Sequence, residues 1–387
     1  MGKRCDYSWD GSHNLTAITE GEDSKITYKY GKTNRRLLSL TAPIGTMNYS
    51  YDENGRVFQV KYSSSSYKKI TYHPNGWCHN IQDDGYPGIY PFNYQYYNNG
   101  NIASILSWAG EENYTYDADG RLTSWTYTPF SGNSVQESYQ YDAAGNLTVK
   151  GTDYYTYDQA NRITNIGYEY DDNGTLTSDG TYEYAYNAEN QLIEVRRSSD
   201  NGLIATYTYY FNGLRKSKTV GEVTTYYHWD AFGNLAQEND TQNNSIAYYY
   251  DPSGNPIGFM KNGDVNQKYI YHTNIRGDVV SITDSTDTIQ AQYTYDPWGI
   301  QTSYTGIITQ PLRYAGYYFD EETGLYYLKS RYYSPETGRF LTKDAYSYVK
   351  NESPQTLNLY VYCGNNPINY TDPTGHEWVV DDNQYTY

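Results

Sequence analysis

Side chains that commonly carry catalysis or bind metals are few and scattered in this sequence. The six histidines and three cysteines lie far apart, without a Cys-x-x-Cys pair or a metal-ligand spacing. The sequence also lacks the GxxxxGK[ST], HExxH and GxSxG motifs of phosphate binding, zinc proteases and serine hydrolases. We therefore expect no metal and no cofactor, and we interpret the thiols as isolated and the histidines as ordinary surface or hairpin residues.

The charge balance argues against several kinds of partner. Asp and Glu number 45 against 28 Lys and Arg, which gives a net charge of -17, and no run of Lys or Arg is longer than two. Nucleic-acid-binding surfaces are basic, so we expect no nucleic acid and no anionic membrane surface as a partner. No apolar run is long enough to span a membrane, and the first residues lack the apolar region of a signal peptide.

Tyrosine dominates the composition and follows a repeat. The chain contains 53 Tyr against 8 Phe and 7 Trp. The template is aromatic-x-aromatic-Asp-x-x-Gly-x followed by Leu, Ile or Val, as at 114–122, 139–147 and 168–176. The second aromatic residue of each copy lies at positions 9, 30, 51, 116, 141, 157, 170, 186, 209, 229, 250, 271 and 295, with Tyr72 and Tyr96 filling the gap after 51. Many steps are therefore about 20 residues, which is typical of a repeat protein.

Each repeat predicts a strand, a turn and a returning strand. Alternating aromatic residues indicate a strand, the following Asp folds onto its own backbone as an Asx-turn, and Gly supplies positive φ. A single hairpin is marginal, whereas stacked hairpins bury a shared face. We therefore predict an all-β chain, with one contiguous β-spiral over residues 7–305 and with the repeat tyrosines on its buried face.

A denser group of motifs lies between residues 312 and 376. They are Tyr314-Ala315-Gly316, Thr323-Gly324-Leu325-Tyr326-Tyr327, Arg331-Tyr332-Tyr333, Thr337-Gly338-Arg339-Phe340, Asn358-Leu359-Tyr360, Asn365-Asn366-Pro367 and Asp372-Pro373-Thr374-Gly375. In order and spacing this segment resembles the core-associated domain of the Rhs/YD-repeat proteins, which include bacterial polymorphic toxins. The preceding repeats match the YD repeat of the same family.

The resemblance implies an architecture. YD repeats wind into a hollow shell, and the core-associated domain closes one end and curls inward. We accordingly expect residues 1–305 to form the β-spiral shell and residues 306–376 to form the plug. Residues 377–387 would be a short tail without a toxin domain. About fifteen repeats would give a partial shell, which we expect to associate with itself or with a further YD-repeat chain at an exposed edge strand.

The resemblance also implies an aspartic autoprotease that acts only on its own chain. The family's two aspartates match Asp344 and Asp372, and its arginine matches Arg331, thirteen residues before Asp344. The cut would fall after Gly375 or His376. Two neighbouring carboxylates share a proton, so that one activates water and the other acts as acid, while a guanidinium holds their charge or the oxyanion.

The match departs from the family pattern in two places. Asp344 is followed by Ala345-Tyr346 instead of Pro-x-Gly, and the two aspartates stand 28 residues apart, a wider spacing than is common. This form resembles the cell-wall-associated WapA-like proteins of Gram-positive bacteria. The other interpretation is that both aspartates only cap turns.

The implied function is a shell that holds and delivers a C-terminal toxin effector, which is absent from this chain, with an immunity protein as a further partner. Such a protein would be secreted or held at a bacterial cell surface. An alternative is an extracellular adhesin whose tyrosine-rich faces bind glycans without catalysis. A third is a structural remnant.

Overall fold

The computed structural model describes residues 5–20, 24–63, 66–84, 91–348 and 357–380. Regular structure in these residues is almost entirely antiparallel β, and the predicted all-β class is confirmed. Two large open sheets follow the chain order strand by strand, and two small sheets follow them.

The first sheet contains β1 (Cys5–Trp9), β2 (Leu15–Glu20), β3 (Ser24–Tyr30), β4 (Leu37–Ala42), β5 (Gly45–Tyr51), β6 (Val57–Lys61), β7 (Tyr67–Tyr72), β8 (Cys78–Asp84), β9 (Phe92–Tyr96), β10 (Ile102–Leu106), β11 (Gly110–Tyr116), β12 (Leu122–Pro129), β13 (Val135–Tyr141), β14 (Leu147–Lys150) and β15 (Asp153–Tyr154). The second contains β16 (Tyr168–Tyr170), β17 (Leu176–Asp179), β18 (Tyr182–Tyr186), β19 (Leu192–Arg197), β20 (Leu203–Tyr209), β21 (Arg215–Val220), β22 (Val223–Trp229), β23 (Leu235–Asp240), β24 (Ser245–Tyr250), β25 (Pro256–Lys261), β26 (Lys268–Thr273), β27 (Val279–Asp284), β28 (Ile289–Tyr295) and β29 (Gln301–Gly306).

The C-terminal segment contains β30 (Tyr318–Asp320), β31 (Leu325–Tyr327), β32 (Tyr332–Ser334) and β33 (Arg339–Phe340) in one sheet, and β34 (Tyr370–Thr371) with β35 (Val379–Val380) in another. Short 3₁₀ helices occur at Tyr314–Gly316 (η1), Tyr346–Tyr348 (η2) and Cys363–Asn365 (η4).

The repeat template maps directly onto the hairpins. In the repeat at 114–122, Asp117 Oδ1 accepts hydrogen bonds from the backbone N–H groups of Asp119 and Arg121, at 3.0 and 2.9 Å. The register shifts by one residue beside Tyr116, which pairs with Leu122 across a β-bulge. Equivalent Asp turns and bulges recur along both sheets. The predicted Asx-turn chemistry is confirmed.

The two tyrosines of a repeat have different structural roles. The first is buried, as Tyr114 is, and belongs to the core. The second reaches back to the previous repeat, where its hydroxyl donates to the carbonyl of the residue that opens the returning strand, as from Tyr116 to Ile102 at 2.8 Å. The same hydrogen bond links Tyr51 to Leu37, Tyr72 to Val57, Tyr141 to Leu122, Tyr157 to Leu147, Tyr209 to Leu192, Tyr250 to Leu235 and Tyr295 to Val279. Each hairpin is thereby fastened to the one before it.

The prediction of a single uninterrupted spiral needs a correction at residues 155–167. The ladder stops after β15 and resumes at β16, and only an isolated bridge between Tyr157 and Ile163 lies between them. The sequence gives the reason, since the steps between the aromatic positions 141, 157, 170 and 186 are shorter here than the usual 20 or so residues. Such short repeats leave too few residues for two full strands.

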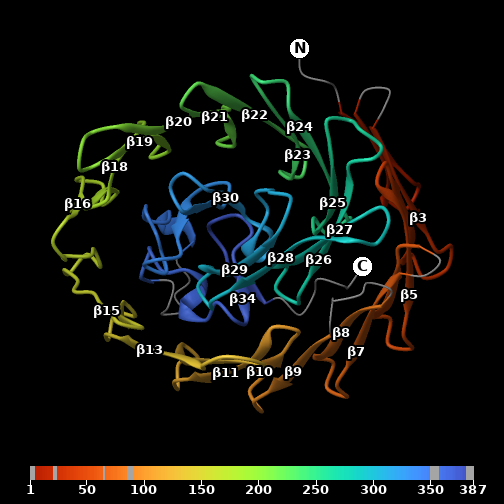
Figure 1. The fold of residues 1–387 in the computed structure, drawn as a ribbon, viewed down its shortest axis with the longest axis horizontal. Coiled ribbons are helices and arrows are strands. Elements are labelled where there is room, and N and C mark those ends of the chain that lie inside the picture. Colours follow the sequence, from red (N-terminus) through yellow and green to blue (C-terminus); the bar gives the residue numbers. More distant parts are fainter. Residues whose placement is uncertain (1–4, 21–23, 64–65, 85–90, 349–356, 381–387) are drawn as a thin grey trace.

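The strip of hairpins winds into a ring, and its end passes inside its beginning (Figure 1). Strands β24–β27 lie against the first strands of the chain, and side chains join the two layers. Lys68 Nζ donates to the Thr273 carbonyl at 3.1 Å, and the buried His272 lies 3.0 Å from Asp83. The Tyr94 hydroxyl accepts the N–H of Ile275 at 3.2 Å. We call this overlap, formed by β1–β9 with β23–β27, the seam.

The C-terminal segment fills the middle of the ring (Figure 1). Its residues 312–362 contribute Tyr314, Tyr326, Tyr333, Tyr362 and other buried aromatic side chains to the same core as β17–β28. A second core lies under the first sheet. The terminal segment therefore covers the interior face of the second sheet, as a plug would, whereas the core under the first sheet includes Ile368 of this segment together with Tyr249, Val280 and Trp298.

Candidate functional site

Asp372 is buried at the start of the tight turn that carries Pro373, Thr374 and Gly375. Its side chain is 2% exposed, and its Oδ1 accepts the backbone N–H groups of Gly375 at 2.8 Å and His376 at 3.0 Å. Its own N–H donates to the Tyr317 hydroxyl at 2.6 Å. Burial raises the pKa of Asp372, against the opposing effects of Arg331 and the backbone donors.

Arg331, which precedes β32, lies across the same turn. Its Nε donates to the carbonyl oxygen of Gly375, and its Nη1 donates to the Leu359 carbonyl at 3.0 Å. Nη2 lies 3.1 Å from Asp344 Oδ2 and 3.8 Å from Asp372 Oδ2. Burial lowers the pKa of Arg331 to about 10, so the guanidinium remains charged at neutral pH.

Packing fixes the plane of this guanidinium. Its central carbon lies 3.6 Å from the centre of the Phe340 ring. Phe340 is buried in β33, whose backbone pairs with β32. The order of the motifs RYY and GRF in the sequence therefore places the cation directly before β32 and the ring beneath it on the adjacent strand β33.

Asp344 follows β33 and meets the turn from the other side. Its Oδ1 lies 2.6 Å from His376 Nδ1, and its side chain is 10% exposed. The His376 ring stacks on Tyr348 of η2, with centroids 4.4 Å apart and an interplanar angle of 8°. The imidazole is thus held between a carboxylate and an aromatic ring.

These contacts surround a single peptide bond, the one between Gly375 and His376. Arg331 binds its carbonyl oxygen, Asp372 accepts its N–H, and Asp344 binds the side chain that follows it. Both carboxylates approach the same guanidinium nitrogen. The structure brings together all five residues named from the sequence, namely Arg331, Asp344, Asp372, Gly375 and His376.

The sequence reasoning missed the contribution of two residues. It treated His376 only as the residue beyond a cut, whereas its ring is in contact with Asp344. It did not single out Tyr317 as a contact of Asp372. The spacing of neither residue signals this role, because each contact depends on how distant segments fold together.

The terminal segment is held in place by asparagines that bind the turns of the repeats. Asn365 Nδ2 donates to the Gly145 carbonyl and Asn366 Nδ2 to the Gly120 carbonyl, each at 2.8 Å. Asn369 accepts the N–H of Ile102 at 2.9 Å. These contacts step from one repeat to the next along the first sheet and orient the segment that leads to Asp372.

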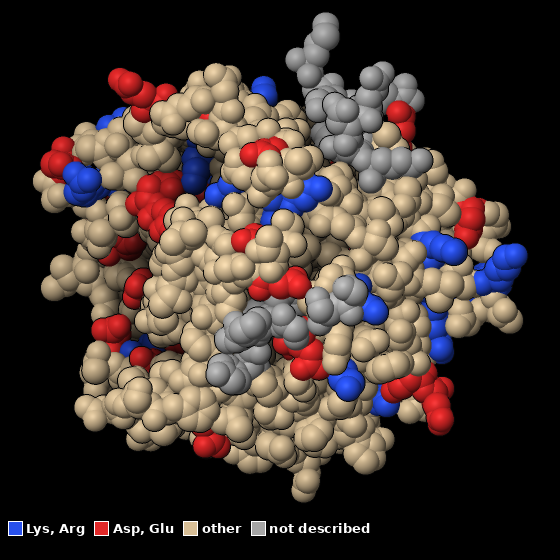
Figure 2. Space-filling view, turned by 45° about the vertical axis from the view of Figure 1, so that its right-hand side comes forward, with Lys and Arg blue, Asp and Glu red and all other residues tan. Residues whose placement is uncertain are grey.

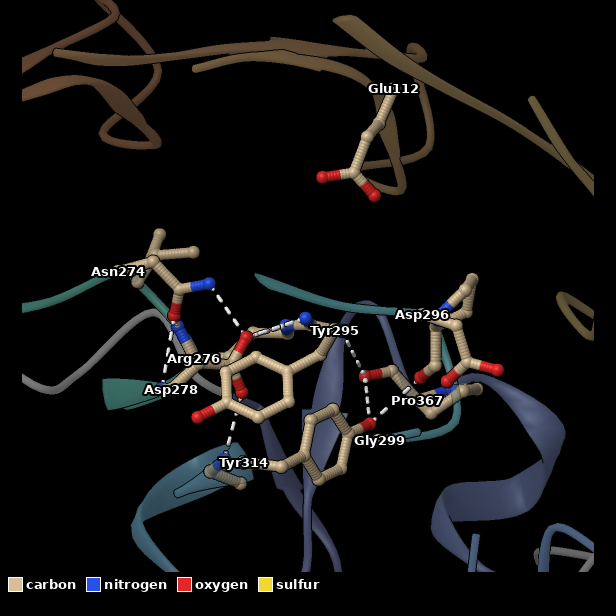
Figure 3. A network of polar contacts seen from close by, with 12 residues as sticks. Glu112, Asn274, Arg276, Asp278, Tyr295, Asp296, Gly299, Tyr314 and Pro367 are labelled. Carbon is tan, nitrogen blue, oxygen red and sulfur yellow. Dashed lines mark hydrogen bonds and ion pairs between the residues drawn. The ribbon is translucent and has the colours of Figure 1, made fainter. Parts of the chain in front are cut away.

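A buried polar cluster beside the seam makes a further attachment (Figure 3). Arg276 Nη1 donates to the Pro367 carbonyl at 3.2 Å, and its Nη2 lies 2.5 Å from Asp278 Oδ2. Asp278 Oδ1 accepts the N–H of Ala315 at 2.8 Å. Glu112 points toward this cluster from β11, and burial raises its pKa (Figure 3). Because Arg276 and Asp278 bind backbone atoms of the terminal segment, we assign this pair to docking.

The residues that the structure describes contain no group of three or more His, Cys, Asp or Glu side chains that could hold a metal ion. Within the same residues, no helix has the length and apolarity needed to cross a membrane. On the face shown in Figure 2, Lys and Arg side chains lie in small separate groups among acidic ones.

An antiparallel strip of aromatic hairpins wound around a motif-rich terminal segment defines a YD-repeat shell. The family model of the teneurin YD-shell matches residues 87–368, and the chain belongs to this family. The predicted Rhs/YD-repeat relationship is confirmed.

Relatives and solved structures extend this result. The tRNA3(Ser)-specific nuclease WapA of Bacillus spizizenii is 34% identical over 286 residues, which cover 69% of this chain and 11% of the relative. The toxin protein Tse5 of Pseudomonas aeruginosa is 34% identical over 105 residues, 27% of this chain and 8% of Tse5. The solved complex TcdB2-TccC3-TEV is similar with a TM-score of 0.80 and 18% identity, covering 96% of this chain and 21% of that one. The chain thus spans about a tenth of the WapA relative and a fifth of the solved neighbour.

Proposed function

We propose that this chain is part of a toxin shell that encloses and delivers a C-terminal effector and cuts itself between Gly375 and His376. The observation that carries the proposal is the arrangement of Arg331, Asp344 and Asp372 around that one bond, inside a ring of YD repeats. Its relatives WapA and Tse5 bear the names of a nuclease and a toxin, which supports a toxin-related role.

The geometry assigns a role to each group. Asp344, the more exposed carboxylate, takes a proton from a water molecule, whose oxygen adds to the carbonyl carbon of Gly375. Arg331 stabilises the negative charge that develops on the carbonyl oxygen. Asp372, whose pKa is raised by burial, acts in its protonated form in this step and gives its proton to the nitrogen of His376 as the C–N bond breaks.

The protons in these reaction steps balance. Asp344 gains the proton that Asp372 loses, and one proton transfer between the two carboxyl groups restores the starting state. The products are a chain that ends with the carboxylic acid of Gly375 and a peptide that begins with the amine of His376, and proton transfer from the acid to the amine leaves a carboxylate and an ammonium group. Arg331 and Asp372 already contact the atoms that become these two ends.

Intact mass of the freshly synthesised 387-residue chain, followed over time, tests the cleavage. We expect a species that ends at Gly375, and we expect Asp344→Asn and Asp372→Asn to remain uncut with an unchanged far-UV spectrum. Arg331→Ala should slow the cut at least as strongly as an oxyanion-hole deletion, about 100-fold or more. Asp264→Asn, which alters a surface turn, is the control. Equal persistence of the unchanged chain and the Asn variants would refute self-cleavage.

Effector delivery, an immunity partner and a secreted or cell-surface location are the wider parts of the proposal. A folded domain fused after Tyr387 should resist added protease if the shell encloses it. The adhesin alternative relied on tyrosine-rich faces, but the first tyrosines of the repeats, such as Tyr94, Tyr114 and Tyr227, are buried. Those tyrosines are therefore not displayed for glycans.

A further inference from the structure

We propose that His376, the residue on the far side of the bond, is a positioning residue for its own cleavage, so that the cut requires a side chain there that hydrogen-bonds to Asp344. The inference rests on the proposed self-cleavage and deepens it. Its ring is part of the chain that is cut, so the substrate itself would complete the site by holding Asp344 in place.

The contacts of His376 support this role. Nδ1 lies 2.6 Å from Asp344 Oδ1, while the other oxygen of the same carboxylate is 3.1 Å from Arg331 Nη2. Each carboxylate oxygen of Asp344 therefore has a side-chain contact. Arg331, on the carbonyl side of the Gly375–His376 bond, contacts one oxygen, and His376, on the amine side, contacts the other. Removing the imidazole leaves Oδ2 with Arg331 and Oδ1 with the backbone N–H of Ala345, at 2.8 Å, so the side-chain contact on the amine side of the bond is lost.

Two further contacts fix the imidazole in this position. Tyr348 stacks on one face of the ring, and the backbone N–H of His376 donates to Asp372 at 3.0 Å. The charged and titratable groups around the ring thus come from four segments, with Asp344 after β33, Tyr348 on η2, Arg331 before β32 and Asp372 after β34. A side chain of another shape would lose either the stack or the Nδ1 contact.

Two replacements separate the contact from the stack. His376→Asn keeps an N–H donor near the Nδ1 position without a titratable ring, and His376→Phe keeps the ring over Tyr348 without a donor. We expect His376→Phe to cut about 10- to 100-fold more slowly, as for loss of a hydrogen bond to a charged group. His376→Asn should cut within about fivefold of the unchanged chain, because its amide retains a donor for Asp344.

The measurement is the intact mass of the full chain against time, from pH 4 to pH 8, with His228→Asn as a matched control. His228 lies in β22 and contacts Asn239 at 2.9 Å, far along the chain from the cut. The thermal midpoint of each variant checks its folding, and the side chain of His376 is 28% exposed, so little core is disturbed.

The outcomes are distinct. An uncut unchanged chain refutes the proposed function and this inference with it. If the unchanged chain is cut and both His376 variants match it in rate, self-cleavage stands and the role of His376 is refuted. A slow Phe variant and an active Asn variant support the positioning role.

Discussion

Replacing Gly375 by alanine measures how closely the carbonyl of residue 375 must lie against Arg331. Gly375 has φ +79°, and an added Cβ would lie 2.5 Å from Ser330 Oγ and 2.7 Å from the Leu328 carbonyl oxygen. Ordinary contact begins at 3.4 Å, so the backbone around residue 375 must move by about 0.7 Å. The left-handed conformation alone costs an alanine about 1–2 kcal/mol.

We expect this shift to slow self-cleavage by about 100-fold, because a misplacement near 1 Å at a reacting group has an effect of that size. Gly324→Ala is the matched control. Gly324 lies in the same terminal segment with φ +71°, but its added Cβ meets nothing within 4 Å. Its replacement therefore carries the conformational cost without the displacement.

The assay combines intact mass over time with unfolding in urea. Both variants should lose about 1–2 kcal/mol from the left-handed alanine, with a larger loss in Gly375→Ala, and only Gly375→Ala should lose cleavage. If the two variants are cut at the same rate, the contact between the Gly375 carbonyl and Arg331 is not needed, and the oxyanion role of Arg331 is wrong.

Three further predictions concern stability, each measured as the free energy of unfolding in urea. Tyr116→Ala should cost about 3 kcal/mol as a large-to-small change, and Tyr116→Phe about 1 kcal/mol for its hydrogen bond to Ile102; a loss below about 0.5 kcal/mol in the alanine variant would contradict the fastening role. Burial alone would raise the pKa of Asp320, but Arg215 and Lys218 hold this pKa below its usual value. Asp320→Asn should therefore cost about 3–5 kcal/mol, and an unchanged urea midpoint would contradict this expectation. Burial raises the pKa of Asp296 to about 6, so its contribution to stability is present in acid and is lost as pH rises through 4 to 6. Asp296→Asn should therefore gain up to about 3 kcal/mol relative to the unchanged chain across that range, at about 1.4 kcal/mol per tenfold change in proton affinity, whereas parallel pH profiles would refute the assignment.

Local chemistry allowed the repeats to be predicted from the sequence. An Asp turn such as that of Asp117 is closed by contacts within four residues, and alternation places Tyr114 inside because a strand has two faces. The interruption after Tyr154 was also present in the sequence as shortened spacing. The prediction did not use the variation in repeat spacing, although the number of residues in a repeat limits the length of its strands.

The terminal site was only partly predictable. The motif order identified Arg331, Asp344 and Asp372 by resemblance, but their distances depend on the fold of the whole segment. Asn366 reaches a turn carbonyl at Gly120, and His272 pairs with Asp83 across the seam. Partners separated by nearly two hundred residues or more leave no local pattern, so side-chain type alone cannot reveal them.

The seam has a consequence for how such a wall can change in size. In a closed barrel, the strand number and stagger must satisfy one geometric condition, and losing a hairpin breaks the circle. Here the two layers meet through side chains such as Lys68 and Tyr94, and the ends of the strip remain open. Adding or deleting one whole repeat would shift the seam along the strip by one hairpin. The strands on either side of the change would still pair with each other. The circumference of the wall is therefore adjustable in units of about 20 residues without a new fold.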